Sequence, residues 1–345
     1  MFKQAGMLFF YTLTPLHPGS GASVAVVDLP IQRERHTNYP MIQASGVKGA
    51  LRDLAKELVD KERIKIVFGP DTDAASEHGG ALSLTDARIL LFPVRSVKGV
   101  FTWITCPGVI ARLQRDLEIV KVTNGNTDDR ALMKLKEIDL PALDPKARHA
   151  STPQGSSVVL DNNQIILEDF CFVLPQDAKR DQVGQLAGWL ADYALPDRLD
   201  YWQDKLKKDL VLLSDDDFRE FVEMSTEVIT RIKLGEKGTV ETGPWDEEHL
   251  PSETLLYSLA LATKPKLTRE ELENAPIKSA EQVLQFLKDE LVAKAKVMQF
   301  GGDETVGKGL VWVRYFEAGK KPGDHKPPEE LEAGAKGGES HAAGD

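Results

Sequence analysis

The sequence has little cysteine and no long hydrophobic run. Its 345 residues include only two cysteines, Cys106 and Cys171, without the spacing of a disulfide framework or a zinc site. Both stand among apolar residues, so we predict buried, reduced thiols. No apolar run reaches the roughly 18 to 20 residues of a membrane span, and the first residues lack the apolar core and cleavage site of a signal peptide. We therefore expect a cytoplasmic protein with no membrane partner.

Positive charge is also in short supply. Lys and Arg number 43 against 54 Asp and Glu, and the resulting net charge of −11 argues against indiscriminate binding of nucleic acid. The charge is uneven, because acid concentrates in residues 213–223, in residues 245–253 and in the last residues. The first third is comparatively basic and contains Arg33, Arg35, Lys48, Arg52, Arg88, Arg95, Lys98, Arg112 and Arg115. A basic groove on an acidic body is compatible with this distribution.

Apolar patterns predict both strands and helices, and a hydrophobic content of 41% is enough for a large core. The aromatic stretch "GMLFFYTLT" predicts a first strand, which ends at a cluster of proline and glycine. A long loop over 15–45 follows, and then a helix over 47–58. We further predict strands in 81–94, 99–106, 163–174 and 309–316, helices in 107–117 and 182–195, a short helix capped by Ser214 in 213–223, and a helix running into a strand in 279–300.

This order of elements predicts an α+β fold in which helices pack on one face of a ferredoxin-like sheet. Two segments depart from the pattern. Residues 231–251 are polar and punctuated by glycine, which is typical of a projecting hairpin or loop. Residues 317–345 lack apolar periodicity, so we predict a disordered acidic tail after a single domain over 1–316.

A glycine-rich stretch, "GGDETVGKG", covers residues 301–309. Its glycines let backbone amides approach an anion where side chains would obstruct it. The stretch nearly satisfies the P-loop pattern, but Gly309 replaces the serine or threonine that would bind magnesium, and a strand is predicted where a P-loop needs a helix. A loop that contacts the phosphate or ribose of a polynucleotide fits better. A purely structural hairpin is the alternative.

A second candidate for anion binding is "ASGVKGALR", residues 44–52, at the start of the predicted helix. Free amides and the helix dipole favour a phosphate there, and Lys48 adds a full charge. An ordinary capped helix with a surface lysine is the alternative. His17, in "LHPGSG", has no second histidine or cysteine at a helpful spacing, so we interpret it as a structural or RNA-packing residue.

Asp28 stands before Leu29 and Pro30 in "VVDLPIQRERHT". One interpretation is a turn aspartate that bonds to its own backbone. The functional interpretation needs partners, and Arg33 and Arg35 would supply positive charge for an anionic substrate. No Ser/His/Asp or Cys/His set stands out elsewhere in the sequence.

Four stretches in this order, "LHPGSG", "VDLPIQRERHT", "SGVKGALR" and "GGDETVGKGL", resemble the RAMP superfamily, and within it the backbone subunits of type III-B CRISPR complexes. The resemblance covers about residues 2–316. It implies a modified ferredoxin-like (RRM-like) palm with an inserted thumb hairpin at about 231–251. It also implies that copies stack head to tail along a CRISPR guide RNA, where the thumb interrupts pairing between guide and target.

The resemblance also implies roles for single residues. The aspartate that matches Asp28 is needed for metal-dependent cleavage of target RNA, so Asp28 is the predicted catalytic residue and metal ligand, with Mg²⁺ or Mn²⁺ as the cofactor. Gly46 departs from the family pattern, because relatives carry a second serine there. The predicted RNA-binding residues are His17, Ser45, Lys48, Arg52, Gly301, Gly302, Thr305, Gly307 and Lys308.

The predicted function is therefore a guide-RNA-binding filament subunit that is also an endoribonuclease. Its expected partners are the guide RNA, a single-stranded target RNA, other copies of itself and other subunits of the complex. A scaffold subunit without nuclease activity is the leading alternative. A P-loop-like nucleotide-binding protein is a third hypothesis, which Gly309 disfavours.

Overall fold

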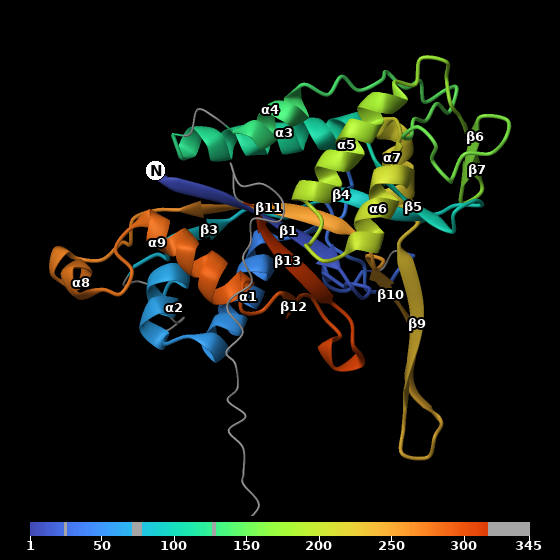
Figure 1. Cartoon of the computed structure of the whole chain (residues 1–345). Helices are drawn as coiled ribbons and strands as arrows, with labels where there is room; N and C mark the ends of the chain where they lie inside the picture. Colours follow the sequence, from blue (N-terminus) through green and yellow to red (C-terminus); the bar gives the residue numbers. More distant parts are fainter. Residues whose placement is uncertain (24–25, 71–77, 126–128, 317–345) are drawn as a thin grey trace, which may run out of the picture.

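The computed structural model describes residues 1–23, 26–70, 78–125 and 129–316, and over these residues a nine-stranded sheet forms the centre (Figure 1). Seven strands follow one another in the order β12-β13-β1-β11-β4-β5-β8, while β2 pairs with β4 and β3 pairs with β11. The strands of this sheet are β1 (Gln4–Thr12), β2 (Met41–Ile42), β3 (Leu82–Leu84), β4 (Ala87–Arg95), β5 (Phe101–Thr105), β8 (Val211–Leu212), β11 (Leu255–Ala262), β12 (Val297–Gln299) and β13 (Leu310–Phe316).

Strand β1 lies in the middle of the sheet. All of its residues after the first are buried, as expected for an apolar run without alternation that is covered on both faces. Tyr11, for example, stands opposite Leu255 of β11 on one side and Trp312 of β13 on the other. The first predicted strand is thus confirmed, and its neighbours come from the last quarter of the chain.

The core of the fold is the predicted ferredoxin-like unit. Elements β1, α1, β4, β11, α9 and β13 succeed one another as β-α-β-β-α-β, with insertions between them. In space the four strands lie in the order β13-β1-β11-β4, and each neighbouring pair is antiparallel. The prediction of a ferredoxin-like palm is confirmed, although its strand β11 was absent from the predicted elements.

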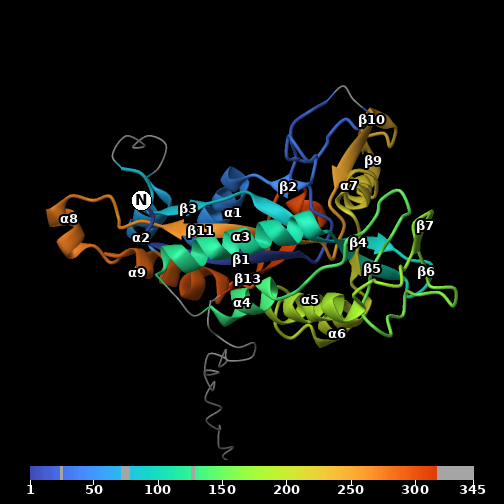
Figure 2. The ribbon, with the colours of Figure 1, turned by 90° about the horizontal axis from the view of Figure 1, so that it is seen from above.

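Helices cover both faces of this sheet (Figure 1 and Figure 2). On one side lie α1, α2 and α9, and on the other α3, which contacts β1 and β4, together with α4 and α5. The prediction of helices on one face is therefore incomplete. The helices are α1 (Ala44–Leu58), α2 (Lys61–Phe68), α3 (Pro107–Thr123), α4 (Arg130–Lys136), α5 (Arg180–Tyr193), α6 (Asp200–Asp209), α7 (Asp215–Met224), α8 (Arg269–Asn274) and α9 (Ala280–Gln285), which continues as a π-helical stretch (Phe286–Val292).

The segment 163–174, predicted as one strand, is a hairpin of β6 (Gln164–Leu167) and β7 (Phe170–Val173). The chain reverses at Glu168, whose φ of 49° lies in the left-handed region. Within β7 only Phe172 is buried, and its neighbour Cys171 is exposed. The prediction of a buried thiol is therefore correct for Cys106 and wrong for Cys171.

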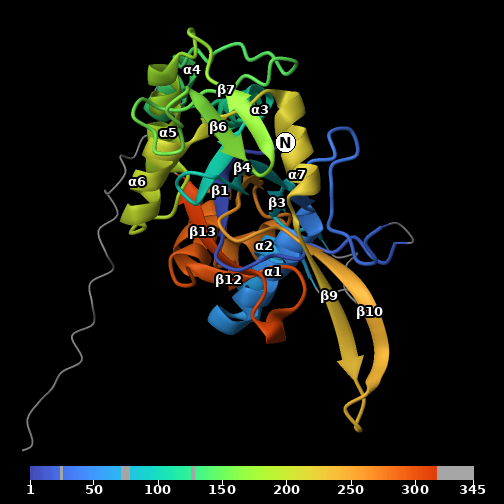
Figure 3. The ribbon, with the colours of Figure 1, turned by 90° about the vertical axis from the view of Figure 1, so that its right-hand side faces the viewer.

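A second hairpin, β9 (Glu227–Leu234) with β10 (Val240–His249), projects from the palm (Figure 1 and Figure 3). The hairpin overlaps the segment 231–251 for which a projecting hairpin or loop was predicted, but its base belongs to the core. Glu247, Glu248, His249 and Leu250 are all buried. Within the described ranges, no helix is both long and apolar enough to cross a membrane. The predicted tail, 317–345, falls outside those ranges.

Candidate functional site

Asp28 lies in the segment between β1 and α1, where this segment passes the base of the β9–β10 hairpin. Its exposed carboxylate accepts a hydrogen bond through Oδ2 from the amide of Asp246, at 2.9 Å. The backbone extends this contact, because Leu29 N donates to Asp246 O and Glu248 N donates to Leu29 O, both at 3.0 Å. The Asp28 side chain therefore fixes its segment to β10, whereas the turn interpretation had it bonding only to its own backbone.

The two arginines that follow Asp28 have different roles. Arg33 donates to the carboxylate of Glu248 at 2.5 Å and to the carbonyls of Asn38 and Val222. It is committed to internal contacts, so the expectation that it holds a phosphate is not met. Of the pair, Arg35 alone is exposed.

His17 and the glycine-rich loop, both assigned to RNA binding from the sequence, lie together in the structure. Gly302 N donates to His17 O at 3.0 Å, and Gly301 has a φ of 73°. A Cβ at Gly301 would overlap the carbonyl of His17, so only glycine fits this close approach. His17 is itself buried, with Nδ1 2.6 Å from the carbonyl oxygen of Glu248. Its backbone carbonyl thereby anchors the glycine-rich loop at Gly302.

The rest of the glycine-rich loop faces solvent. Thr305 and Gly307 are exposed and Lys308 is half-buried, and the loop leads from β12 through a single 3-10 turn (Glu304–Val306) into β13. Because a strand follows where a P-loop needs a helix, the structure disfavours nucleotide hydrolysis here. An exposed, glycine-rich loop that a phosphate can approach closely suits a polynucleotide backbone instead.

Helix α1 carries Ser45, Lys48 and Arg52 on its first turns. Ser45 is exposed, and burial lowers the pKa of Lys48, followed by the nearby charges of Arg52 and Lys266. Lys266 was missed by sequence reasoning, since it lies far along the chain after β11. Helix α1 also contacts β12, which leads into the glycine-rich loop. The two predicted RNA-binding stretches thus belong to neighbouring elements.

The amino end of α1 is not wholly open to an anion. The amide of Ala44 donates to the carboxylate of Asp86 at 2.8 Å, which occupies one of the free donors of the first turn. The alternative of an ordinary capped helix is therefore partly realised. Any phosphate at this end must be held chiefly by side chains, and Lys48 is the most direct candidate.

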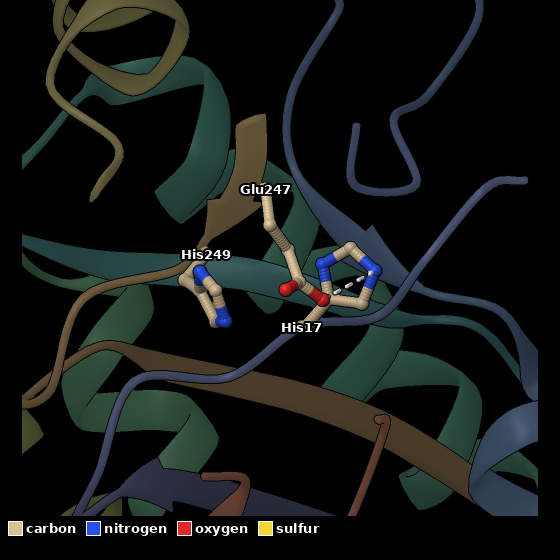
Figure 4. Close-up of side chains that lie close together, drawn as sticks. All are labelled: His17, Glu247 and His249. Carbon is tan, nitrogen blue, oxygen red and sulfur yellow. Dashed lines mark ion pairs between the residues drawn. The ribbon is translucent and has the colours of Figure 1, made fainter. Parts of the chain in front are cut away.

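A buried cluster at the hairpin base was also missed. His17, Glu247 and His249 each place one donor atom within 4.8 Å of the others (Figure 4). His17 Nε2 lies 3.7 Å from Glu247 Oε1. Burial lowers the pKa of His249, which favours the neutral imidazole. No local signal in the sequence reveals this cluster, because the contact between two distant segments creates it.

The fold, together with the similarity of the sequence to known proteins, identifies the family of this chain. Residues 9–312 match the RAMP superfamily, and the chain belongs to this family. It is 38% identical over 327 residues to the CRISPR system Cmr endoribonuclease Cmr4 of Pyrococcus furiosus. The aligned region covers 93% of this chain and 99% of that protein. The predicted resemblance to a type III-B backbone subunit is confirmed at this level.

Solved structures agree with this placement. The crystal structure of oligomeric Cmr4 from Pyrococcus furiosus has a TM-score of 0.64 and 32% identity, covering 91% of this chain and 98% of that one. A chain of the type III-B Cmr-beta complex in its apo state has a TM-score of 0.66 and 26% identity, with the same two coverages of 91% and 98%. The palm architecture is therefore shared along almost the whole described chain.

Proposed function

We propose that this chain is a CRISPR RNA-binding filament subunit of a type III-B effector complex and cleaves complementary target RNA. The observation that carries the proposal is its 38% identity with an endoribonuclease, Cmr4, along nearly the full length of both proteins. The similarity to an oligomeric Cmr4 and to a chain of Cmr-beta supports partners of two kinds, further copies and other subunits. The complex would act in the cytoplasm.

The guide RNA would follow the side of the palm formed by α1 and the glycine-rich loop. Ser45, Lys48 and Arg52 provide a hydroxyl and two cationic side chains on α1. Gly301, Gly302, Thr305, Gly307 and Lys308 provide a loop that a sugar–phosphate backbone can approach closely. Contacts of both kinds are independent of base identity, which suits a subunit that must hold any guide.

Cleavage would depend on Asp28. One exposed carboxylate, anchored through Oδ2 by the Asp246 amide, fits a hard cation that keeps most of its waters and uses substrate phosphate oxygens. Mg²⁺ or Mn²⁺ bound there would stabilise the charge that develops at the scissile phosphate. Asp28 would hold the cation against the hairpin base, and Arg35, which is exposed seven positions further along the chain, would attract the phosphate.

The nucleophile in this scheme belongs to the RNA. The 2′-hydroxyl attacks the adjacent phosphorus and loses its proton to solvent, the bond from phosphorus to the 5′ oxygen breaks, and that oxygen takes up a proton. The reaction requires the nucleotide to be unstacked, so that the 2′-hydroxyl, phosphorus and leaving oxygen can align. The β9–β10 hairpin would supply this distortion in the neighbouring copy's duplex.

The hairpin is suited to such a role because it stands apart from the palm. Beyond its base, β9 and β10 pair with each other, and Ile232, Leu234 and Val240 are at least half exposed. Apolar side chains displayed on a free ribbon mark a surface that contacts another molecule. We assign this hairpin as the thumb, with its free part at about 230–245.

The alternative is a scaffold subunit in which Asp28 serves only to attach its segment to β10. Complexes assembled with Asp28→Asn in every copy separate the two hypotheses, because asparagine keeps an oxygen that can accept from Asp246 N but loses the charge. Guide binding and target capture should persist, while the rate of target cleavage in Mg²⁺ or Mn²⁺ falls by at least about 100-fold.

A matched control for this experiment is Asp169→Asn. Asp169 is an exposed carboxylate, 96% accessible, in the β6–β7 turn, far along the chain from the hairpin base. Cleavage at the normal rate is expected for this control. If complexes with Asp28→Asn also cut target at the normal rate, Asp28 is a structural residue and the chemistry belongs to another group.

A further inference from the structure

The cluster of His17, Glu247 and His249 is built from two segments that lie 230 positions apart in the sequence. His17 follows β1, and the other two residues are the last alternate positions of β10, so their side chains point to the same face of that strand. All three are buried, and their donor atoms lie within 4.8 Å of one another (Figure 4). A hairpin base would not need two imidazoles and a carboxylate for packing alone.

The imidazole of His249 has no hydrogen-bond partner among the described residues. The side chain is 1% exposed. Buried polar groups in folded proteins are almost always satisfied. An imidazole left without a donor or acceptor, and directed at a carboxylate and a second imidazole, points to a missing ligand.

His17 is oriented as metal-binding histidines usually are. Its Nδ1 lies 2.6 Å from the carbonyl oxygen of Glu248. A carbonyl only accepts, so Nδ1 must carry the proton, which leaves Nε2 available as the donor atom toward Glu247. A backbone carbonyl on the far nitrogen is a common second partner for an imidazole bound to metal.

Arg231 orients the acidic side of the cluster. It donates to Glu247 Oε2 at 2.5 Å and to Asp303 Oδ1 at 2.6 Å. The other oxygen of each carboxylate is left for the histidines: Glu247 Oε1 lies 3.7 Å from His17 Nε2, and Asp303 Oδ2 lies 3.6 Å from His249 Nε2. Asp303 Oδ2 is also buried without a hydrogen-bond partner among the described residues. Two carboxylates and one arginine leave one negative charge to attract a cation.

We propose that His17, Glu247 and His249 bind a divalent transition metal of the Zn²⁺ class, with Asp303 as the fourth donor. Two imidazole ligands favour Zn²⁺ over Mg²⁺, which prefers oxygen. Tetrahedral Zn²⁺ sets its donors roughly 3.3 Å apart. His17, Glu247 and His249 must therefore draw together by up to about 1.5 Å, and Asp303, which lies outside their group, must move further. The metal would join the segment after β1, the hairpin base and the glycine-rich loop. Asp28 is not one of these four ligands.

The test uses the full-length chain, freed of RNA by nuclease and of metal by a chelator. Zn²⁺ should bind at one equivalent per chain, as measured by competition with a chromogenic chelator. His249→Gln, checked for folding by circular dichroism, should weaken Zn²⁺ binding by more than the 10- to 100-fold typical of removing a residue that only hydrogen-bonds to a metal ligand. His36→Gln, which alters an exposed histidine, and Asp28→Asn should both bind as the wild type does.

X-ray absorption at the zinc edge of the wild-type complex gives a result that does not depend on how a variant folds. Two imidazole nitrogens in the coordination shell support the proposal, whereas a shell of oxygen alone overturns it. Wild-type affinity in a folded His249→Gln variant also overturns it. The same holds if the metal-free wild type takes up no Zn²⁺, in which case the cluster is only a buried polar contact between His17 and Glu247.

Discussion

Lys48 is the side chain through which α1 would hold the guide. It is half-buried beside Arg52 and Lys266, and burial followed by these two charges lowers its pKa. Lys48→Glu should weaken RNA binding and reduce the log–log salt slope by about 0.7 for each phosphate that the side chain no longer neutralises. Fluorescence anisotropy across a series of salt concentrations measures both quantities.

The control for Lys48 lies on the same helix. Lys56 is 58% exposed near the far end of α1 and pairs with Asp53 at 2.9 Å. Lys56→Glu makes the same change of charge away from the first turns, so the salt slope should change little. Equal effects of the two substitutions would mean that RNA responds to the overall charge of α1 and not to a specific interaction with Lys48.

Glu253 makes stability depend on pH. Burial raises its pKa to about 7, and Oε2 has no hydrogen-bond partner among the described residues. Because the folded state holds this proton more tightly than the unfolded state does, its stabilising contribution is complete below about pH 4.5 and is lost as the pH rises through about 7.

Glu253→Gln should remove that loss, since glutamine stays neutral. The difference in free energy of unfolding between variant and wild type, measured in urea, should favour the variant more at pH 8.5 than at pH 5.5. Glu236→Gln, at the exposed tip of the β9–β10 hairpin, provides the comparison. A constant difference over this range would show that Glu253 is ionised in the folded protein throughout.

Single residues differ in how far the sequence could predict them. The pairing of His17 with Gly302 was predictable in outline, because both belong to motifs of one family. Arg33 was misjudged because its partner Glu248 is 215 positions away, and no local pattern shows that a loop arginine will be buried in an ion pair. The partnerless state of His249 among the described residues is likewise set by packing alone.

The β9–β10 hairpin can be tested by shortening it. The buried base, from Glu247 to Leu250, has to remain, as does Arg231, which bonds to Glu247 and Asp303. Replacing residues 233–242 with a short Asn-Gly turn removes only the free part. The melting temperature of the chain should stay within a few degrees of the wild type, because the removed residues are largely exposed.

Complexes assembled with this shortened chain should bind target but lose cleavage or its regular spacing. Gel analysis of end-labelled target RNA measures the spacing directly. An unchanged ladder of products would show that the free part of the hairpin does not distort the RNA. A large fall in melting temperature would show instead that the hairpin stabilises the palm, which its exposed surface does not predict.

Secondary structure was predictable where a segment is long and strongly patterned. Strand β1 and helix α1 combine apolar periodicity with clear breakers. Strand β11 was missed, since "LLYSLALA" lacks alternation and its leucines and alanines favour a helix as readily as a strand. Pairing with β1 and β4 on either side makes this segment a strand. Such pairing is a tertiary effect, which local propensity does not include.

The distribution of charge over the whole molecule differs from its distribution along the chain. Several arginines that make the first third basic are neutralised internally: Arg88 pairs with Asp116 and Arg112 with Glu34. Helix α1 and the glycine-rich loop carry Lys48, Arg52 and Lys308. A narrow positive region on a body of net charge −11 suits a subunit that shares one RNA with its neighbours and rejects others.

The position of β1 also affects how the protein is made. On a ribosome this strand emerges before its two partners, β11 and β13, which follow some 250 and 300 positions later. An apolar strand with no available neighbour is a template for wrong pairing. The palm therefore closes only after β13 has been made. Because such distant contacts fold slowly, β1 stays open to wrong pairing during that time.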